Sequence, residues 1–543
     1  MDRPPHRSRS RLKVNAGAVK PKRWNTLTVK RKRSAFSVCV VIALITLALY
    51  CSQYFYAGVM RPVFAYPAYG LLALAAIGGL PLLYRSTARG TALFLLVPLI
   101  LWMIAHSIIS SDIWQADRHL HLTLSCSLLF LLSGYAITSP HNRMLLLFLW
   151  IGGGLLQAGI GLAQVQGWLP HIPQGWYSEQ LRVWYQRDYG HRASGTYINP
   201  NHLCWFLNST ALFAFSFGLL GKARAPSRIA SFLAAGLMVA ASLTASSRGG
   251  VISLASGMAA LLTGATVAAA FLIRSRKMLA RFLPGYAALC LLPAGILFLV
   301  LRRHDIFRNR DLLSDNYRPG LWQVAMNAWE RSPWIGGGPG SFIYYSRLER
   351  GNANNDDYFA HNDWLQCATD FGLVGLVLCS LLTLFLLFSG LRLFARSLAR
   401  IQKNGQSNSA ALALGATCSL VTFCVHSVFD FNMQLPANAL YAATVAGLLV
   451  GPSSKAQPGR WFPMGLAGIL ALVLAISLFQ NRNEWYWLKA ENALVRKDFA
   501  TAYVEAKKGL ALSPNHPKLQ ALFAETVMHQ LSIDPAGALV LLN

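Results

Sequence analysis

The chain has 543 residues, of which 54% are hydrophobic and only 13% are charged. A soluble protein carries about 25% charged residues, so the composition excludes an ordinary soluble domain and, with its long apolar blocks, indicates a multi-pass membrane protein. The formal net charge of +28 would suggest nucleic-acid binding in a soluble protein. Much of it lies at the N-terminus, however, and no basic, aromatic nucleic-acid-binding fold follows, so we expect no nucleic-acid partner.

The N-terminal segment 1–33 is a basic tail. It contains twelve Lys or Arg residues, a single acid, Asp2, and no apolar run. Such a composition predicts disorder. Because basic segments before a first span stay in the cytoplasm, the tail is expected to be cytoplasmic. The apolar run after it is long and lacks a small-residue cleavage site, which is not typical of a cleavable signal peptide.

Residues 34–480 are predicted to form an all-α, polytopic membrane bundle of about 12–13 transmembrane helices. A span needs about 20 mostly apolar residues. The candidate spans are 34–54, 62–84, 91–109, 119–138, 143–163, 201–220, 229–244, 250–273, 282–301, 365–391, 410–428, 437–451 and 461–480. If the N-terminus is cytoplasmic, the basic loops fall inside, and the short outer loops carry only Arg61, Arg118 and Arg248. This agrees with the positive-inside rule.

Two long loops, 164–200 and 302–364, then fall on the outer side of the membrane. Loops of this length usually carry function. Both are rich in Trp and Tyr, which suit the faces of sugars and equally suit the membrane interface. The adjacent acids Asp356 and Asp357 have no other acids near them in sequence, so we interpret them as part of a solvated loop.

The C-terminal segment 481–543 also falls outside and differs in kind. It reads as amphipathic helices with a break at Ser513-Pro514, and its pattern resembles one tetratricopeptide repeat. One repeat cannot bury its own apolar face. The segment is therefore expected to pack on the loops or on a protein partner, and a plain helical cap fits as well as a docking module.

The nine cysteines do not form a recognisable framework. Their number is odd, no C-x-x-C motif occurs, and nearly all lie inside apolar runs. A disulfide framework or zinc site is not expected from this pattern. We predict no metal and no cofactor.

Two polar motifs mark helix starts on the outer side. In "GTYINPNH", Gly195–His202, Asn199 and Asn201 can cap the following helix or contact substrate. In "TASSRGG", Thr244–Gly250, Arg248 lies in a very short outer turn. It can snorkel to lipid phosphate or face inward to hold an anion, and its small neighbours would let a phosphate approach the backbone.

The third motif is "NYRPGLWQVAMNAWERSPWIGGGPGSF", Asn316–Phe342. Pro319 fits the first turn of a short helix, and Arg318 lies at its start. The "WIGGGPG" segment is interpreted as a flexible turn. It lacks the G-K-[ST] ending of a phosphate-binding loop, and no strand precedes it.

The fourth motif, "FAHNDWLQCATD", Phe359–Asp370, leads into an apolar run. On a helix starting near His361, the side chains of Asp363, Gln366 and Asp370 share a face. His361 could be a general base, because an unperturbed pKa of about 6.5 suits proton transfer near neutral pH, or a water-bonded interfacial histidine. We expect Asp363 and Asp370 chiefly to orient the helix and its neighbours.

The fifth motif, "VHSVFDFNMQLPAN", Val425–Asn438, lies at the outer end of a later span. His426 and Asp430 are four residues apart, which predicts one helix face. They form either a hydrogen-bonded pair or part of a site.

Together these motifs resemble the bacterial O-antigen ligase and polysaccharide polymerase superfamily. The matching segments are "GTYINPNHLCWFL", "TASSRGGVISL", "YRPGLWQVAMNAWERSPWIGGGPGSF", "AHNDWLQCATDFGLVGL" and "HSVFDFNMQLPANALYAA". They occur in the family's order and cover about 195–450, whereas the N-terminal half matches only in hydropathy. The resemblance implies a bacterial inner-membrane enzyme whose active face is periplasmic.

The resemblance also implies a reaction and its residues. Such enzymes pass a glycan from undecaprenyl diphosphate to an acceptor hydroxyl of lipid A core, another glycan or a protein, by a metal-independent, inverting mechanism. The family's catalytic arginines and loop histidine match Arg248, Arg318 and His361. Candidate substrate contacts are Arg182, Arg187, Arg192, Asn199, Asn201, Asp363, His426 and Asp430.

Other functions stay open at the level of sequence. A protein O-oligosaccharyltransferase of the same superfamily has the same motifs. A transporter of polysaccharide or lipid-linked sugar is compatible with thirteen spans, although no inverted repeat is evident and the polar residues gather at one face. A non-catalytic assembly subunit, recruited through 481–543, is the third alternative.

Overall fold

A computed structural model describes residues 23–54, 62–86, 90–110, 112–169, 192–197, 199–303, 318–349, 358–450 and 461–533. Within these ranges the regular structure is helical throughout. Arg182, Arg187, Asp356 and Asp357 lie outside the described residues, as does most of the basic tail.

The helices follow the predicted apolar segments closely. Their bounds are α1 Arg23–Tyr54, α2 Pro62–Tyr84, α3 Leu93–Ile109, α4 Ile113–Leu131, α5 Pro140–Val165, α7 Pro200–Leu220, α8 Ala225–Thr244, α9 Arg248–Leu272, α10 Arg276–Arg303, α13 Asp363–Asn404, α14 Asn408–His426, α15 Pro436–Leu448 and α16 Trp461–Gln480. Two short helices, α11 Arg318–Arg331 and α12 Phe342–Glu349, lie in the second long loop. Twelve helical segments of the described chain are long and apolar enough to cross a membrane.

The helix α15 is the one predicted span that falls short of that length. It has 13 residues, which is about 20 Å at 1.5 Å per residue. Near its start, Asn438 Nδ2 donates to His202 O, and near its end, Leu448 O accepts from Arg143 Nη1. Because α15 is almost completely buried between its neighbours, its length need not match the thickness of the lipid.

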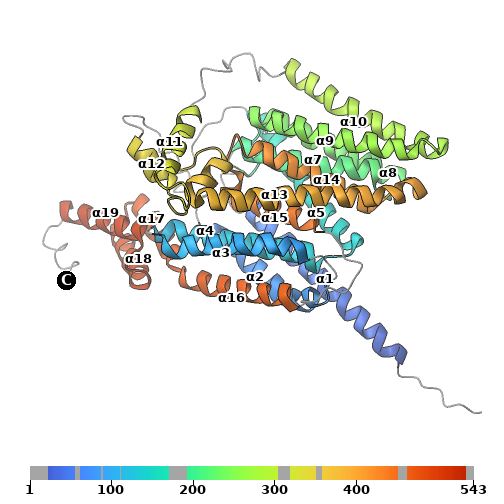
Figure 1. Cartoon of the computed structure of the whole chain (residues 1–543). Coiled ribbons are helices and arrows are strands. Elements are labelled where there is room, and N and C mark those ends of the chain that lie inside the picture. The colour runs from blue at the N-terminus through green and yellow to red at the C-terminus, as the bar shows by residue number, and fades with distance from the viewer. Residues whose placement is uncertain are drawn as a thin grey trace, which may run out of the picture.

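The bundle has two distinct ends. The site end is where α7 and α13 begin and α14 finishes, and α11 and α12 lie beside it (Figure 1). The far end holds the turns between α7 and α8, α9 and α10, and α13 and α14. The central helix α7 is buried along its whole length, whereas α10 is largely exposed on the outside of the bundle.

The C-terminal segment forms three helices, α17 Asn483–Val495, α18 Phe499–Leu512 and α19 Pro517–Ile533. They lie at the same end as α11 and α12 (Figure 1). Trp487 packs edge-on against Trp114 of α4, with 6.3 Å between ring centroids, and Lys518 lies over the Trp114 ring. The predicted amphipathic helices are present and pack on the membrane bundle. The likeness to a tetratricopeptide repeat stays a prediction.

The long helix α13 is broken at Gly372, which has a φ of +66°. The segment Pro333–Gly338 docks on this break: Leu373 N donates to Pro333 O, Gly337 N to Thr369 O, and Gly338 N to Asp370 O. Asp370 adds side-chain bonds from Gln366 Nε2 and Ser341 Oγ. The prediction of a flexible turn was therefore wrong, because the glycines allow close backbone contact with α13 rather than freedom.

Replacing Gly372 by alanine should destabilise the protein strongly. A Cβ there would overlap the carbonyl of Trp334, and a positive φ adds strain of about 1–3 kcal/mol. We expect a melting temperature in detergent several degrees lower. Gly320→Ala in α11, where a Cβ meets nothing within 4 Å, is the matched control and should leave it unchanged. Equal melting temperatures for both variants would contradict this account.

Candidate functional site

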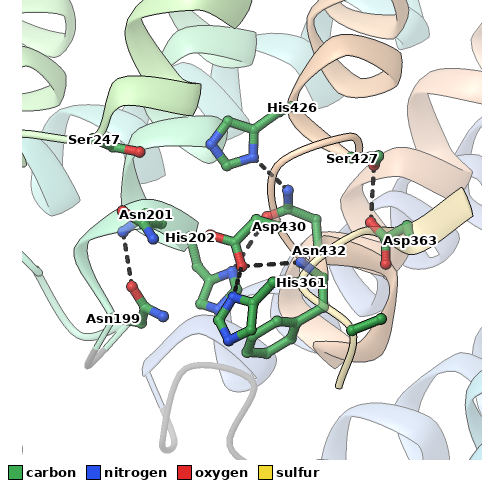
Figure 2. A network of polar contacts seen from close by, with 12 residues as sticks. Asn199, Asn201, His202, Ser247, His361, Asp363, His426, Ser427, Asp430 and Asn432 are labelled. Carbon is green, nitrogen blue, oxygen red and sulfur yellow. Dashed lines mark hydrogen bonds and ion pairs between the residues drawn. The ribbon is translucent and has the colours of Figure 1, made fainter. Parts of the chain in front are cut away.

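The centre of the site is a contact between His361 and Asp430, which are 69 positions apart in the chain. His361 Nδ1 lies 3.3 Å from Asp430 Oδ1, and both side chains are buried (Figure 2). Asn362, the next residue, caps α13 by accepting from Trp364 N and Leu365 N. The helix start therefore fixes the position of His361.

The backbone of the site is strained. His361 has a φ of +50° and Ser246, in the turn before α9, has a φ of +51°. Among the described residues, Lys497 is the one further non-glycine residue with positive φ. Such conformations cost free energy and gather at functional sites, where the surrounding structure maintains them.

Asp363 anchors the loop that carries Asp430. Its carboxylate accepts from Ser427 Oγ at 2.8 Å and from Met433 N at 3.2 Å. Its backbone N–H donates to Ser427 O and Asp430 O. This agrees with the orienting role expected from the sequence, and a direct substrate contact by Asp363 remains a prediction.

Three histidines surround Asp430. Burial alone would raise the pKa of its carboxyl, but His202, His361 and His426 outweigh burial and hold that pKa below its ordinary value. His202 lies in the first turn of α7, His361 lies two residues before the start of α13, and His426 is the last residue of α14. Asp430 is therefore a buried carboxylate whose negative charge is stabilised by its interactions with three imidazole rings.

Replacing Asp430 by asparagine should lower turnover by roughly 10- to 1,000-fold, since the partner that holds His361 loses its charge. A second readout is stability against pH. The unfolded carboxyl has a pKa of about 3.9 and the folded one a lower pKa, so its stabilisation is present above about pH 4 and is lost as the pH falls further. The wild-type melting temperature should thus fall more steeply between pH 5 and 3 than that of Asp430→Asn. Parallel curves with unchanged turnover would contradict the role of Asp430.

The side chain of Asn432 forms hydrogen bonds with both His202 and His426. Its Nδ2 lies 2.6 Å from His426 Nδ1, and its Oδ1 lies 3.3 Å from His202 Nδ1 and 2.9 Å from Asn438 Nδ2. Figure 2 shows His202, His361 and His426 grouped around Asp430 and Asn432. The predicted helix face shared by His426 and Asp430 was wrong, because α14 ends at His426 and the chain turns away.

His202 is a site residue that the sequence motifs did not predict. It lies in the quoted segment "GTYINPNH", but the asparagines there gave the stronger signal as helix caps. The ring of Phe431 contacts the rings of both His202 and His361 edge-on, with centroid distances of 4.7 Å and 4.6 Å.

Arg318 begins α11 and lies near enough to His202 and His426 to act on both electrostatically. Its Nε is buried and has no hydrogen-bond partner within the described chain. In the same described part, Asp430 Oδ2 and His426 Nε2 are also buried without a partner. Buried polar atoms are nearly always hydrogen-bonded, so a group of three such atoms suggests a place for a bound polar molecule.

Arg248 is the first residue of α9, behind the cap Ser247. A Cβ on Gly249 would meet Phe429, and one on Gly250 would meet Cys204. The space beside both glycines is therefore filled by protein atoms. The sequence-based prediction that a phosphate could approach the backbone at these glycines was wrong. The two glycines instead bring the start of α9 against the loop that carries Asp430.

Three predicted substrate contacts make bonds within the protein. Arg192 Nε donates to Ala245 O, and its Nη2 donates to Asn201 Oδ1. Asn199 Oδ1 accepts from Asn201 N and caps α7. These bonds tie the end of the first long loop to α7 and to the turn before α9. A role of these residues toward substrate stays a prediction.

An apolar cavity of about 240 Å³ lies next to the site. It runs between α3, α4, α13, α14 and α15, and its walls include Leu99, Met103, Phe371, Leu382, Phe423 and Ala446. Asp363, Ser427 and Met433 line it as well, so it touches the same loop that carries Asp430. In the residues that the structure describes, no group of three or more His, Cys, Asp or Glu side chains is arranged to hold a metal ion.

The fold and this site define a multi-pass helical membrane protein with a buried histidine–aspartate pair and an arginine at one end of its bundle. Residues 233–380 match the model of the O-antigen ligase family. The match confirms the resemblance found in the sequence and supports a ligase or polymerase type of function in general. It contains Arg248, Arg318 and His361, whereas Asp430 lies beyond it. No curated protein matches the chain significantly.

Proposed function

We propose that the protein transfers a glycan from undecaprenyl diphosphate to an acceptor hydroxyl at the periplasmic face of the bacterial inner membrane. The observation that carries the proposal is the buried contact between His361 and Asp430 beside Arg318, whose Nε lacks a partner in the described chain. Arg318 and His361 belong to the region that matches the O-antigen ligase family.

In this proposal His361 is the general base. Its Nδ1 faces Asp430, so Nε2 is assigned to the acceptor hydroxyl and takes its proton. The deprotonated oxygen attacks the anomeric carbon, a new glycosidic bond forms, and the bond from that carbon to the diphosphate breaks. Asp430 stabilises the imidazolium that results.

The arginines stabilise the leaving group. The departing diphosphate gains negative charge, and guanidinium groups bind phosphate oxygens through paired N–H donors. Arg318 is placed to act in this way, and Arg248, at the helix start that packs against the Asp430 loop, is the second candidate. Charge stabilisation of this kind is commonly the largest single contribution to such a reaction.

The apolar cavity supports a lipid-linked donor. Most of its lining is apolar, with a smaller number of polar side chains that include Asp363 and Ser427, which suits part of a polyprenyl chain. Because it meets the site at Asp363 and Ser427, a chain bound there would place its diphosphate close to Arg318 and His361.

The acceptor can be identified by deleting the gene and displaying surface glycans on a gel. Loss of lipopolysaccharide ladders with glycan accumulating on the lipid carrier would identify a ligase. Ladders of a single repeat unit would identify a polymerase, and unmodified pilin with normal ladders would identify a protein transferase. Unchanged glycans on every one of these acceptors would contradict the proposal.

A further inference from the structure

The far end of the bundle is strongly basic. Segments 221–228, 274–281 and 392–408 together hold eleven Lys or Arg residues and no Asp or Glu. These turns join α7 to α8 and α9 to α10, and include the end of α13. A positive end of this kind is expected next to a cytoplasmic leaflet, but it does not by itself define a binding site.

Within this end lies a cavity of about 270 Å³. Its walls combine cationic, polar and apolar side chains from four helices or their ends: Leu219, Arg228, Ser275, Lys277, Met278, Arg281, Phe282, Asn404, Gly405 and Gln406. Its size is close to the lower limit for small-molecule sites. It is suited to a head group and its phosphate rather than to a whole nucleotide.

The three cations of the cavity are not equivalent. Arg228 Nε donates to Gly218 O at 2.7 Å and Nη2 donates to Leu219 O at 3.1 Å, so this residue caps the end of α7. Lys277 and Arg281 lie one turn apart on α10, are exposed, and make no ion pair with an acid of the described chain. Like charges at this spacing repel each other, and a bound anion would remove that cost.

The surface beyond the cavity favours a lipid as the source of the anion. From Lys277 and Arg281, α10 continues with exposed apolar side chains, including Leu283, Leu291 and Phe298. Met278 and Phe282 give the cavity itself an apolar wall on the same helix. A soluble phosphate would use none of these surfaces, whereas acyl chains would lie along them.

We propose that this cavity binds the phosphate of an anionic glycerophospholipid from the leaflet at the far end of the bundle. Lys277 and Arg281 pair with the phosphate, Arg228 completes the positive wall, and the acyl chains lie on α10. The proposal concerns the end of the bundle opposite to the site and does not depend on the proposed glycan transfer.

The test measures lipid binding to the purified full-length protein in detergent by native mass spectrometry. Phosphatidylglycerol and phosphatidylcholine with identical acyl chains are the probes. We expect preferential binding of phosphatidylglycerol. In the double variant Lys277→Ala and Arg281→Ala its affinity should fall about tenfold or more, since each basic residue near a lipid surface strengthens binding about fivefold.

The matched control is the double variant Lys222→Ala and Arg224→Ala. It removes the same charge from the same end of the bundle but from outside the cavity, and it should keep wild-type affinity within about twofold. A second test variant, Lys277→Gln and Arg281→Gln, keeps polar side chains on α10, and its elution volume and melting temperature verify that it is folded.

Three outcomes would overturn the proposal. Equal binding of the two lipids would show that the phosphate charge is not recognised. Equal losses in the cavity and control variants would show a diffuse charge effect in place of a site. Displacement of phosphatidylglycerol by millimolar inorganic phosphate or glycerol 3-phosphate would show that the cavity takes the anion without the lipid.

Discussion

Replacing His361 by alanine is expected to abolish glycan transfer while the protein still folds and inserts. A positioned general base typically contributes 10²- to 10⁴-fold to a rate, so turnover should fall by at least about 100-fold. The two other histidines of the site are already engaged: His426 bonds to Asn432, and His202 lies against the ring of Phe431 and near Asn432. The measurement is the initial rate of transfer with purified protein and a lipid-linked donor.

Backbone strain offers a sharper version of the same experiment. His361 has a φ of +50°, a conformation that asparagine tolerates better than alanine does. His361→Asn should therefore keep the wild-type melting temperature and still lack a base. His141→Ala, an exposed histidine in the first turn of α5, is the control and should keep full activity. Activity of His361→Asn within threefold of wild type would exclude His361 as the base.

Replacing Arg318 by alanine is the second change with a large expected effect. Removing one preorganised donor to a developing negative charge costs roughly 10²- to 10³-fold in rate. Arg318→Lys should recover part of the loss, since lysine keeps the charge but not the two-pronged geometry. Initial rates for the three proteins at saturating donor test this order.

Arg331 in the same short helix provides the control for Arg318. It is largely exposed, and its Nη2 bonds to Glu349 Oε1 at 2.9 Å on the surface. Exposed ion pairs contribute about 0–1 kcal/mol, so Arg331→Ala should keep rate and stability near wild type. Similar losses for Arg318→Ala and Arg331→Ala would show that α11 acts only through its fold.

Much of the bundle could be predicted from the sequence. A helix that faces lipid must be long and apolar, and the Lys and Arg residues in every second turn indicate that successive helices run in opposite directions. The exception was α15. Its 13 residues lie inside a shell of other helices, with Asn438 bonded to His202 near one end and Leu448 bonded to Arg143 at the other. Hydropathy reports apolar composition and cannot tell a helix that faces lipid from one enclosed by protein.

The site was harder to predict than the helices. The motifs identified Arg318, His361 and Asp430 separately, but the contact between His361 and Asp430 depends on where α14 ends and how the following loop folds back. Regular spacing placed His426 and Asp430 on one helix face, but α14 ends at His426 and Asp430 lies in the following loop, where it still interacts electrostatically with His426. The sequence around His202 gave no functional signal, since a histidine in the first turn of an apolar helix resembles any other buried polar residue of a protein core.

The central claim is that this protein forms a glycosidic bond with His361 as base and Arg318 on the diphosphate. The most direct test places the purified full-length protein in lipid vesicles with a labelled, polyprenyl-diphosphate-linked glycan and an acceptor, and measures labelled product and released polyprenyl diphosphate. We predict both products with wild type, and at least about 100-fold less of each with His361→Asn. Movement of the labelled lipid across the vesicle membrane without a new bond, or undiminished product from His361→Asn, would contradict the claim.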